Sequence, residues 1–217
     1  MKNENMRIIT RVFFLVLAAC VAAIALPAAA QPAPTPPAQL KGPALVAALR
    51  GGGYVLYFRH TATDFSQSDD RMTEHEDCAY QRNLIDRGRA DARAIGAAIR
   101  ALGIPIGEVL ASPFCRTIET AQLIFGRATA SAALRGGPSG TETPGQYAAL
   151  RALLSSAVPR GTNLVLVAHG NPYRAIFGGA YLAEGEAAVI EPRGKDGFRE
   201  VARVQLDEWR TLATASK

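Results

Sequence analysis

Two runs of apolar residues give the chain its clearest pattern. They cover residues 54–58 and 163–168, and both are bounded by glycine or polar residues, as buried strands typically are. The first run ends in Arg59 and His60, and the second ends in His169. In open α/β sheets, ligands bind beyond the carboxyl ends of such strands. These three polar side chains are therefore candidates for a functional site.

The rest of the chain alternates between helical and extended patterns. Apolar residues at a spacing of three and four indicate helices, and short continuous apolar runs indicate strands. This alternation predicts an α/β domain with a closing pair of strands near the end. The predicted helices cover residues 40–50, 87–102, 147–157, 171–181 and 207–212, and the other predicted strands cover residues 106–111, 128–134, 186–190 and 198–206.

A further helix is predicted directly after the strand at residues 106–111. Ser112 is its expected cap, and Pro113 is its expected first residue, where a missing N–H does no harm. Arg116 then projects from the first turn. Because a helix start carries free N–H groups and partial positive charge, this position suits a phosphate group.

Three motifs in sequence order resemble the histidine phosphatase (phosphoglycerate mutase-like) superfamily. They are Arg-His at residues 59–60, Ser-Pro-x-x-Arg-Thr-x-x-Thr-Ala at residues 112–121, and Val-Ala-His-Gly at residues 167–170. The resemblance runs from about Gly53 to Val204. It implies an α/β fold, a three-layer α/β/α sandwich with a mostly parallel central sheet. One departure is visible, because the family usually has glycine after the first histidine and this chain has Thr61.

The resemblance implies phosphoryl transfer, for which the residue types are suitable. A phosphomonoester dianion must be neutralised, and the guanidinium groups of Arg59 and Arg116 match phosphate oxygens in bidentate fashion. We assign the nucleophile to His60, whose neutral imidazole would form a transient phosphohistidine. His169 would donate to the phosphoryl oxygens as charge spreads over them. Thr61 joins Arg59, Arg116 and His169 as an expected substrate contact.

A carboxylic acid should protonate the leaving oxygen and then activate water. Related enzymes supply it from about the region of Glu142, which is our first candidate. Asp64 and Glu186 remain alternatives. No metal or other cofactor is expected, because two arginines and a histidine carry the positive charge.

Residues 61–78 are polar and acidic, and we expect a loop that faces the substrate. His75 in this segment is expected to be solvated, and Arg82 just beyond it is interpreted as a surface arginine. Cys78 and Cys115 form an even pair of cysteines, which predicts a disulfide in an oxidising compartment. Two unpaired thiols remain the alternative.

Composition supports one domain and a small anionic substrate. The chain has 217 residues, of which 48% are hydrophobic, enough for a sizeable core. The net charge is +5, of which residues 1–30, with three basic residues and one acidic residue, contribute +2. The remaining +3 suits a phosphomonoester substrate. No basic run with interleaved aromatic residues favours nucleic acid.

Residues 1–30 have the pattern of an export signal. A basic start is followed by an apolar centre over residues 12–26 and by three alanines before Gln31. Cleavage after Ala30 is the preferred interpretation, and lipid attachment at Cys20 is the alternative. The apolar centre is too short for a comfortable membrane span, which needs about 20 residues. The expected location is periplasmic or secreted.

The expected domain boundaries follow from these segments. Residues 31–39, with four prolines in nine residues, form an extended linker, and residues 40–217 form the histidine phosphatase-like domain. Two functions fit this organisation. The first is an exported phosphohydrolase. The second is an exported phosphate- or sugar-phosphate-binding protein with impaired catalysis, which would keep the arginines and need no acid.

Overall fold

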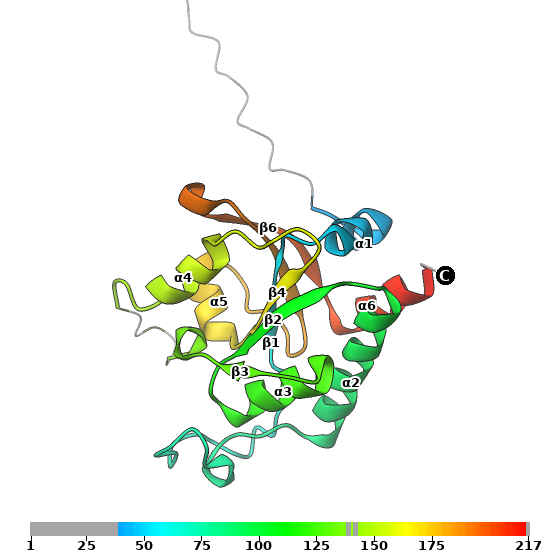
Figure 1. Cartoon of the computed structure of the whole chain (residues 1–217). Helices are drawn as coiled ribbons and strands as arrows, with labels where there is room; N and C mark the ends of the chain where they lie inside the picture. Colours follow the sequence, from blue (N-terminus) through cyan, green and yellow to red (C-terminus); the bar gives the residue numbers. More distant parts are fainter. Residues whose placement is uncertain (1–38, 138–139, 141–142, 216–217) are drawn as a thin grey trace, which may run out of the picture. The chain divides into compact units, whose positions relative to one another are not determined.

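One six-stranded sheet, of strand order β3-β2-β4-β1-β5-β6, forms the centre of the domain (Figure 1). The computed structural model describes residues 39–137, 140 and 143–215. Strands β3, β2, β4 and β1 are parallel to one another. Strand β5 pairs antiparallel with β1, and β6 pairs antiparallel with β5. The strands are β1 (Val55–Arg59), β2 (Ile106–Ala111), β3 (Thr129–Ala130), β4 (Asn163–Ala168), β5 (Ala187–Pro192) and β6 (Phe198–Val204).

Helices cover both faces of the sheet, which confirms the predicted three-layer α/β/α sandwich. Helices α1, α2, α3 and α6 pack on one face, and α4 and α5 on the other (Figure 1). Strand β1 shows how the two cores divide, because side chains alternate along a strand. Leu56 and Phe58 face the first core, and Val55 and Tyr57 face the second. The helices are α1 (Gly42–Gly51), α2 (Asp86–Ala101), α3 (Cys115–Phe125), α4 (Ala148–Ser155), α5 (Gly170–Phe177) and α6 (Leu206–Ala215).

The register of the sheet places the ends of β1 and β4 side by side. Arg59 pairs with Ala168 in this parallel ladder. The next backbone N–H, of His60, donates to the carbonyl oxygen of Ala168 at 3.1 Å. His60 and His169 therefore leave the same edge of the sheet on neighbouring strands.

Three predicted elements differ from the structure. The expected strand at residues 128–134 is only the two-residue β3, and a short 3-10 helix (Ala132–Leu134) follows and buries Leu134. Helix α3 begins at Cys115, with Phe114 rather than Ser112 at its N-cap. Helix α5 ends at Phe177 rather than at residue 181. Gly178 and Gly179 follow it with φ of +72° and +69°, a backbone region that ends helices and favours glycine.

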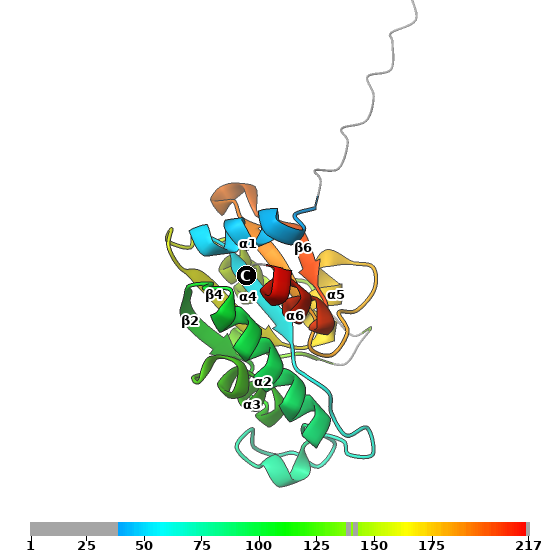
Figure 2. The ribbon, with the colours of Figure 1, turned by 90° about the vertical axis from the view of Figure 1, so that its right-hand side faces the viewer.

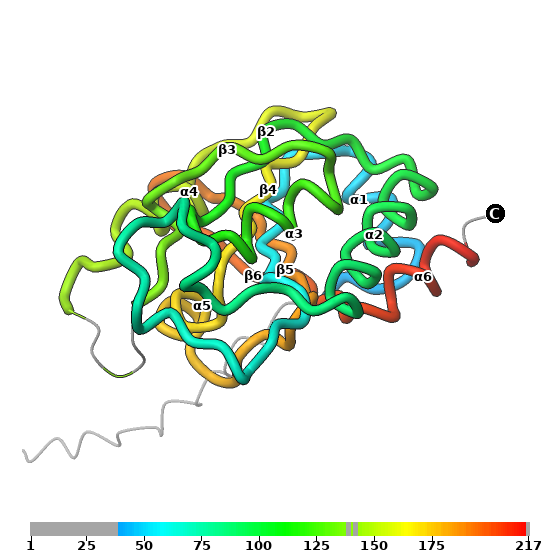
Figure 3. The backbone as a smooth tube through the Cα atoms, turned by 90° about the horizontal axis from the view of Figure 1, so that it is seen from below, coloured from blue at the N-terminus to red at the C-terminus, as the bar shows by residue number. Residues whose placement is uncertain are grey.

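A long connection joins β1 to α2, and we call residues 61–85 the polar loop. It extends beyond the carboxyl end of β1 at the bottom of the view in Figure 2. Seen from below, its teal trace passes in front of the strands (Figure 3). Its only regular structure among the described residues is a short 3-10 helix (Cys78–Tyr80) and a single bridge between Thr63 and Leu84.

The N-terminal expectations lie almost wholly outside the described residues. The structure describes neither residues 1–30 nor residues 31–38 of the expected linker. Within residues 39–215, wherever the chain is described, no helix is long and apolar enough to cross a membrane.

Candidate active site

His60 follows directly on β1 and is 1% exposed. Its Nδ1 lies 2.9 Å from the carbonyl oxygen of Thr61. Because a carbonyl oxygen can only accept, Nδ1 carries the proton, and Nε2 keeps a free electron pair. The backbone N–H of Thr61 in turn donates to Thr120 Oγ1 at 3.2 Å. The residue after the histidine therefore fixes both the position and the tautomer of the ring.

His169 is the N-cap residue of α5, directly after β4, and is 6% exposed. Its Nε2 lies 2.8 Å from Ser112 Oγ, so the serine predicted to cap α3 contacts this ring instead. The ring of Phe114 packs edge-on against His169 at 5.0 Å between centroids. The two imidazole centroids are 5.7 Å apart. Their spacing leaves the two rings as neighbours in one cavity.

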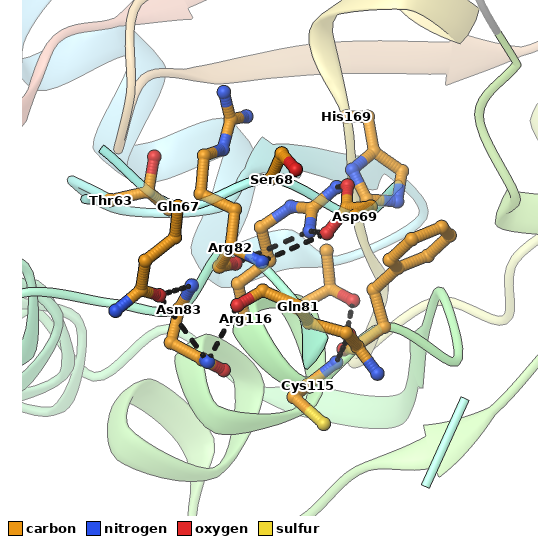
Figure 4. Close-up of polar contacts among 12 residues, drawn as sticks. Thr63, Gln67, Ser68, Asp69, Gln81, Arg82, Asn83, Cys115, Arg116 and His169 are labelled. Carbon is orange, nitrogen blue, oxygen red and sulfur yellow. Dashed lines mark hydrogen bonds and ion pairs between the residues drawn. The ribbon is translucent and has the colours of Figure 1, made fainter. Parts of the chain in front are cut away.

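Arg116 projects from the first turn of α3 and is 5% exposed. Its two terminal nitrogens donate to the two oxygens of Asp69, at 2.9 and 3.0 Å. Asp69 also accepts the backbone N–H of Arg82 at 2.9 Å, so a carboxylate of the polar loop lies between the two arginines (Figure 4). The guanidinium of Arg116 also stacks over Phe114. This bidentate pairing is the geometry that an arginine offers to phosphate oxygens.

Arg59, the last residue of β1, is held from the segment that precedes β5. One terminal nitrogen donates to the carbonyl oxygen of Leu182 at 2.7 Å, and the other lies 3.8 Å from Glu184 Oε1. Its Nε is buried without a hydrogen-bond partner in the described part of the chain. Because buried polar groups are nearly always hydrogen-bonded, this unpaired N–H is a reason to expect a ligand beside Arg59.

A cavity of about 590 Å³ joins these side chains. The strands and the starts of α3 and α5 contribute four residues predicted from sequence, and the polar loop contributes five of the other eleven. Arg82, interpreted from sequence as a surface arginine, lines this cavity. The lining residues are Arg59, His60, Gln67, Ser68, Asp69, Asp70, Arg82, Phe114, Arg116, Gly136, Gly137, His169, Gly170, Asn171 and Tyr181.

Both imidazoles are held neutral. Burial, followed by the positive charges of Arg116, Arg59 and Arg82, lowers the pKa of His60 to about 3, against the opposing effect of its hydrogen bond to Thr61. Burial, then Arg116, also lowers the pKa of His169 well below its usual value. A neutral imidazole with a free nitrogen is the form that can act as a nucleophile.

A disulfide between Cys78 and Cys115 ties the polar loop to the first residue of α3, with the two Cα atoms 5.7 Å apart. The predicted pairing is therefore present. Gln81 strengthens this junction, because its Oε1 accepts the backbone N–H of Cys115 at 2.9 Å and its Nε2 donates to the carbonyl oxygen of His75 at 2.7 Å. Arg116 lies next to the cross-link. The position of the loop is thus coupled to the position of this arginine.

The other predicted site residues that the structure describes are not among those that line the cavity. Thr61 is buried, and its side chain lies 3.3 Å from Thr120 Oγ1. Asp64 bonds to Ser66 in the outer part of the polar loop. Glu186 accepts the backbone N–H of Ala183. Glu142, the first candidate for the acid, lies outside the described residues.

Sequence reasoning missed four residues at or beside the site: Ser112 as a partner of His169, and Asp69, Arg82 and Glu184. Of these four, only Ser112 belongs to one of the three sequence motifs, the one at residues 112–121. Within the described residues, no group of three histidine, cysteine, aspartate or glutamate side chains could hold a metal ion.

Comparisons with known proteins find similarity to one family over the first part of the domain, and to solved structures over most of it. Residues 55–137 match the family model described as histidine phosphatase superfamily (branch 1). This part of the chain is therefore similar to the superfamily that the three sequence motifs indicated. Among curated proteins, none matches the sequence significantly.

Solved structures show a similar fold at low sequence identity. A mutant phosphoserine phosphatase from Entamoeba histolytica, in complex with phosphoserine, is 13% identical, with a TM-score of 0.50 over 71% of this chain and 98% of that one. A protein from Thermus thermophilus, TTHB049, is 18% identical, with a TM-score of 0.48 over 69% and 98% of the two chains. The protein histidine phosphatase SixA complexed with tungstate is 16% identical, with a TM-score of 0.49 over 71% and 97%.

Proposed function

We propose that this chain is an exported phosphohydrolase that cleaves phosphomonoesters through a phosphohistidine on His60. The observation that carries the proposal is the state of His60. It is neutral, its Nδ1 proton is bonded to Thr61, and it lines the cavity next to His169 and two arginines. Phosphoryl transfer needs a nucleophile of this kind together with a cationic wall.

The first step forms one bond and breaks another. The electron pair of His60 Nε2 forms the N–P bond while the P–O ester bond breaks, and the leaving oxygen takes up a proton. Arg59 and Arg116 bind the non-bridging oxygens, and His169 donates to them as charge accumulates. In the second step water attacks phosphorus and gives its proton to the carboxylate of the acid that protonated the leaving oxygen, the N–P electron pair returns to Nε2, and inorganic phosphate leaves.

The proton donor should be a carboxylic acid that reaches the leaving oxygen in the cavity. Among the described residues, only Asp69 and Asp70 supply carboxylates to the cavity. Both oxygens of Asp69 accept hydrogen bonds from Arg116, so this group is held as an acceptor and suits proton donation poorly. Asp64 and Glu186 do not line the cavity. Glu142 therefore stays our candidate for the acid, with Asp70 as the one to test beside it.

A turnover assay with a chromogenic phosphomonoester tests the proposal, together with acid-labile phosphate trapping on the protein. Wild-type protein should release product and carry phosphate on His60. His60→Ala should lose both, by a factor of at least about 10⁴ in kcat, while keeping measurable affinity for inorganic phosphate. Near-full activity of His60→Ala contradicts the nucleophile assignment. Phosphate binding by the wild type without product release supports the alternative binding protein instead.

The exported location is the second part of the proposal. The pattern of residues 1–30 supports it, and so does the disulfide, since such bonds persist in oxidising compartments. Cell fractionation and N-terminal sequencing of the mature protein test it. A mature chain that begins at Gln31 is expected. A chain that begins with a lipid-modified Cys20 supports the alternative, and an intact cytoplasmic chain contradicts export.

A further inference from the structure

Glu184 lies behind the candidate nucleophile and outside the cavity lining. Its Oε1 is 3.8 Å from His60 Nδ1 and also 3.8 Å from the nearest terminal nitrogen of Arg59. The hydroxyl of Thr63 donates to the same oxygen at 2.7 Å and so fixes it in place. One carboxylate oxygen thus contacts the arginine, the histidine and a buried threonine together.

The segment that carries Glu184 is built around the end of β1. The carbonyl oxygen of Leu182 accepts from Arg59, and the N–H of Gly185 donates to the carbonyl oxygen of His60 at 3.0 Å. Gly185 has φ of +81°, and a Cβ there would lie 3.1 Å from Leu206 Cδ1. The turn therefore needs glycine at this position, and the turn directs the preceding glutamate toward His60.

The chemistry of His60 gives this carboxylate a role. When Nε2 bonds to phosphorus, Nδ1 keeps its proton, so the ring acquires one positive charge. Burial, and then the three arginines near the ring, oppose that charge, and both lower the pKa of the ring. A negative carboxylate 3.8 Å from Nδ1 attracts the charge in a site of low dielectric constant.

We propose that Glu184 is a positioning residue that stabilises the positive charge His60 gains on phosphorylation, while the carbonyl oxygen of Thr61 accepts the Nδ1 proton. The inference rests on the proposed function and adds a residue to it. Glu184 does not touch the substrate, because it does not line the cavity. It also weakens the pull of Arg59 on a bound phosphate, since the carboxylate partly neutralises that cation.

Two opposing effects follow, and Glu184→Gln separates them. Phosphorylation of His60, measured by rapid quench in a single turnover, should slow by about tenfold, less than the loss of a direct oxyanion donor. The inhibition constant of inorganic phosphate should stay equal or fall, because Arg59 is freed from its counter-charge. Glu108→Gln, at an exposed position on β2, is the matched control and should change neither value.

Thr63→Val provides a second variant, with the same shape but no hydroxyl donor to Glu184. It should slow phosphorylation in the same direction by a smaller factor, about threefold. A phosphorylation rate unchanged in Glu184→Gln overturns the inference. So does a raised KM with kcat unchanged, which is the result expected if the residue only holds Arg59 in place.

The same measurements distinguish failure of this inference from failure of the proposed function. If the function is wrong, the wild type neither hydrolyses phosphomonoesters nor forms phosphohistidine. If only the inference is wrong, the wild type does both and Glu184→Gln matches it.

Discussion

The cavity has two walls that are built in different ways. One wall, formed by Arg59, His60 and His169, continues the backbone ladder of β1 and β4. The other belongs to the polar loop, residues 61–85, which side chains and one disulfide hold in place. From this difference we expect the sheet to position the proposed reacting groups and the loop to control what reaches them.

The strand-end wall should give the largest effect when it is broken. His169→Ala removes a donor to the phosphoryl oxygens but no backbone contact, so the protein should fold normally. We expect kcat/KM to fall by about 10²- to 10³-fold, as for other donors to a developing charge. Steady-state assays of folded protein measure this. A loss below threefold, with Ser112→Ala as the milder comparison, would remove His169 from the mechanism.

Breaking the loop wall should lower the stability of the protein. Replacing both Cys78 and Cys115 by serine opens a cross-link with a sequence separation of 37. The chain-entropy relation gives a loss of about 3–4 kcal/mol in the free energy of unfolding. Denaturant unfolding measures it, and reduction of the wild type should reproduce it. Equal stability of the oxidised wild type and the double variant would contradict this account.

The sequence predicted the strand-end wall because local pattern determines it. An apolar run that ends in Arg59 and His60 must place them at a strand end, and His169 follows from a second such run. Ser112 was assigned correctly to the β2–α3 junction, but its partner was not. A capping role depends on neighbours along the chain, whereas its bond to His169 depends on the register of β2 and β4.

The loop wall was outside the reach of sequence pattern. Asp69 is one of several acidic residues between 61 and 78, and nothing local distinguishes it from the others. Its contact with Arg116 spans 47 residues. Arg82 and Glu184 were missed for the same reason, because irregular segments carry no period from which a direction can be inferred.

The buried imidazoles of the strand-end wall should also make stability depend on pH. Folded His60 and His169 have lowered pKa values, so the unfolded chain binds more protons below its ordinary value of about 6.5. Stability is therefore complete above about pH 6.5 and falls as the pH is lowered toward 3. His60, with a folded pKa of about 3, should contribute a loss of about 2 kcal/mol at pH 5, and His169 should add to it in the same direction.

Urea unfolding at pH 7.5 and pH 5 measures this dependence. His60→Gln should narrow the difference between the two pH values by the contribution of one histidine. An unchanged difference would mean that His60 is not held neutral in the folded protein. Asp77→Asn, in the polar loop but outside the cavity lining, is the control variant. It should leave the difference in unfolding free energy between the two pH values unchanged.

The smallest predicted effect concerns Asp69 in the loop wall. It tests whether this residue affects the binding of phosphate or the chemical step. Asp69 occupies the two nitrogens that Arg116 would offer to phosphate, so a substrate must displace it. Asp69→Asn removes the competing charge, and the inhibition constant of inorganic phosphate and the KM should both fall, by about three- to tenfold. Asp70→Asn is the matched comparison, because Asp70 lines the same cavity without contacting Arg116, and its effect should be smaller. A collapse of kcat in Asp69→Asn with phosphate affinity unchanged would instead identify Asp69 as the proton donor, and the loop would then share in the chemistry that we assign to the strand ends.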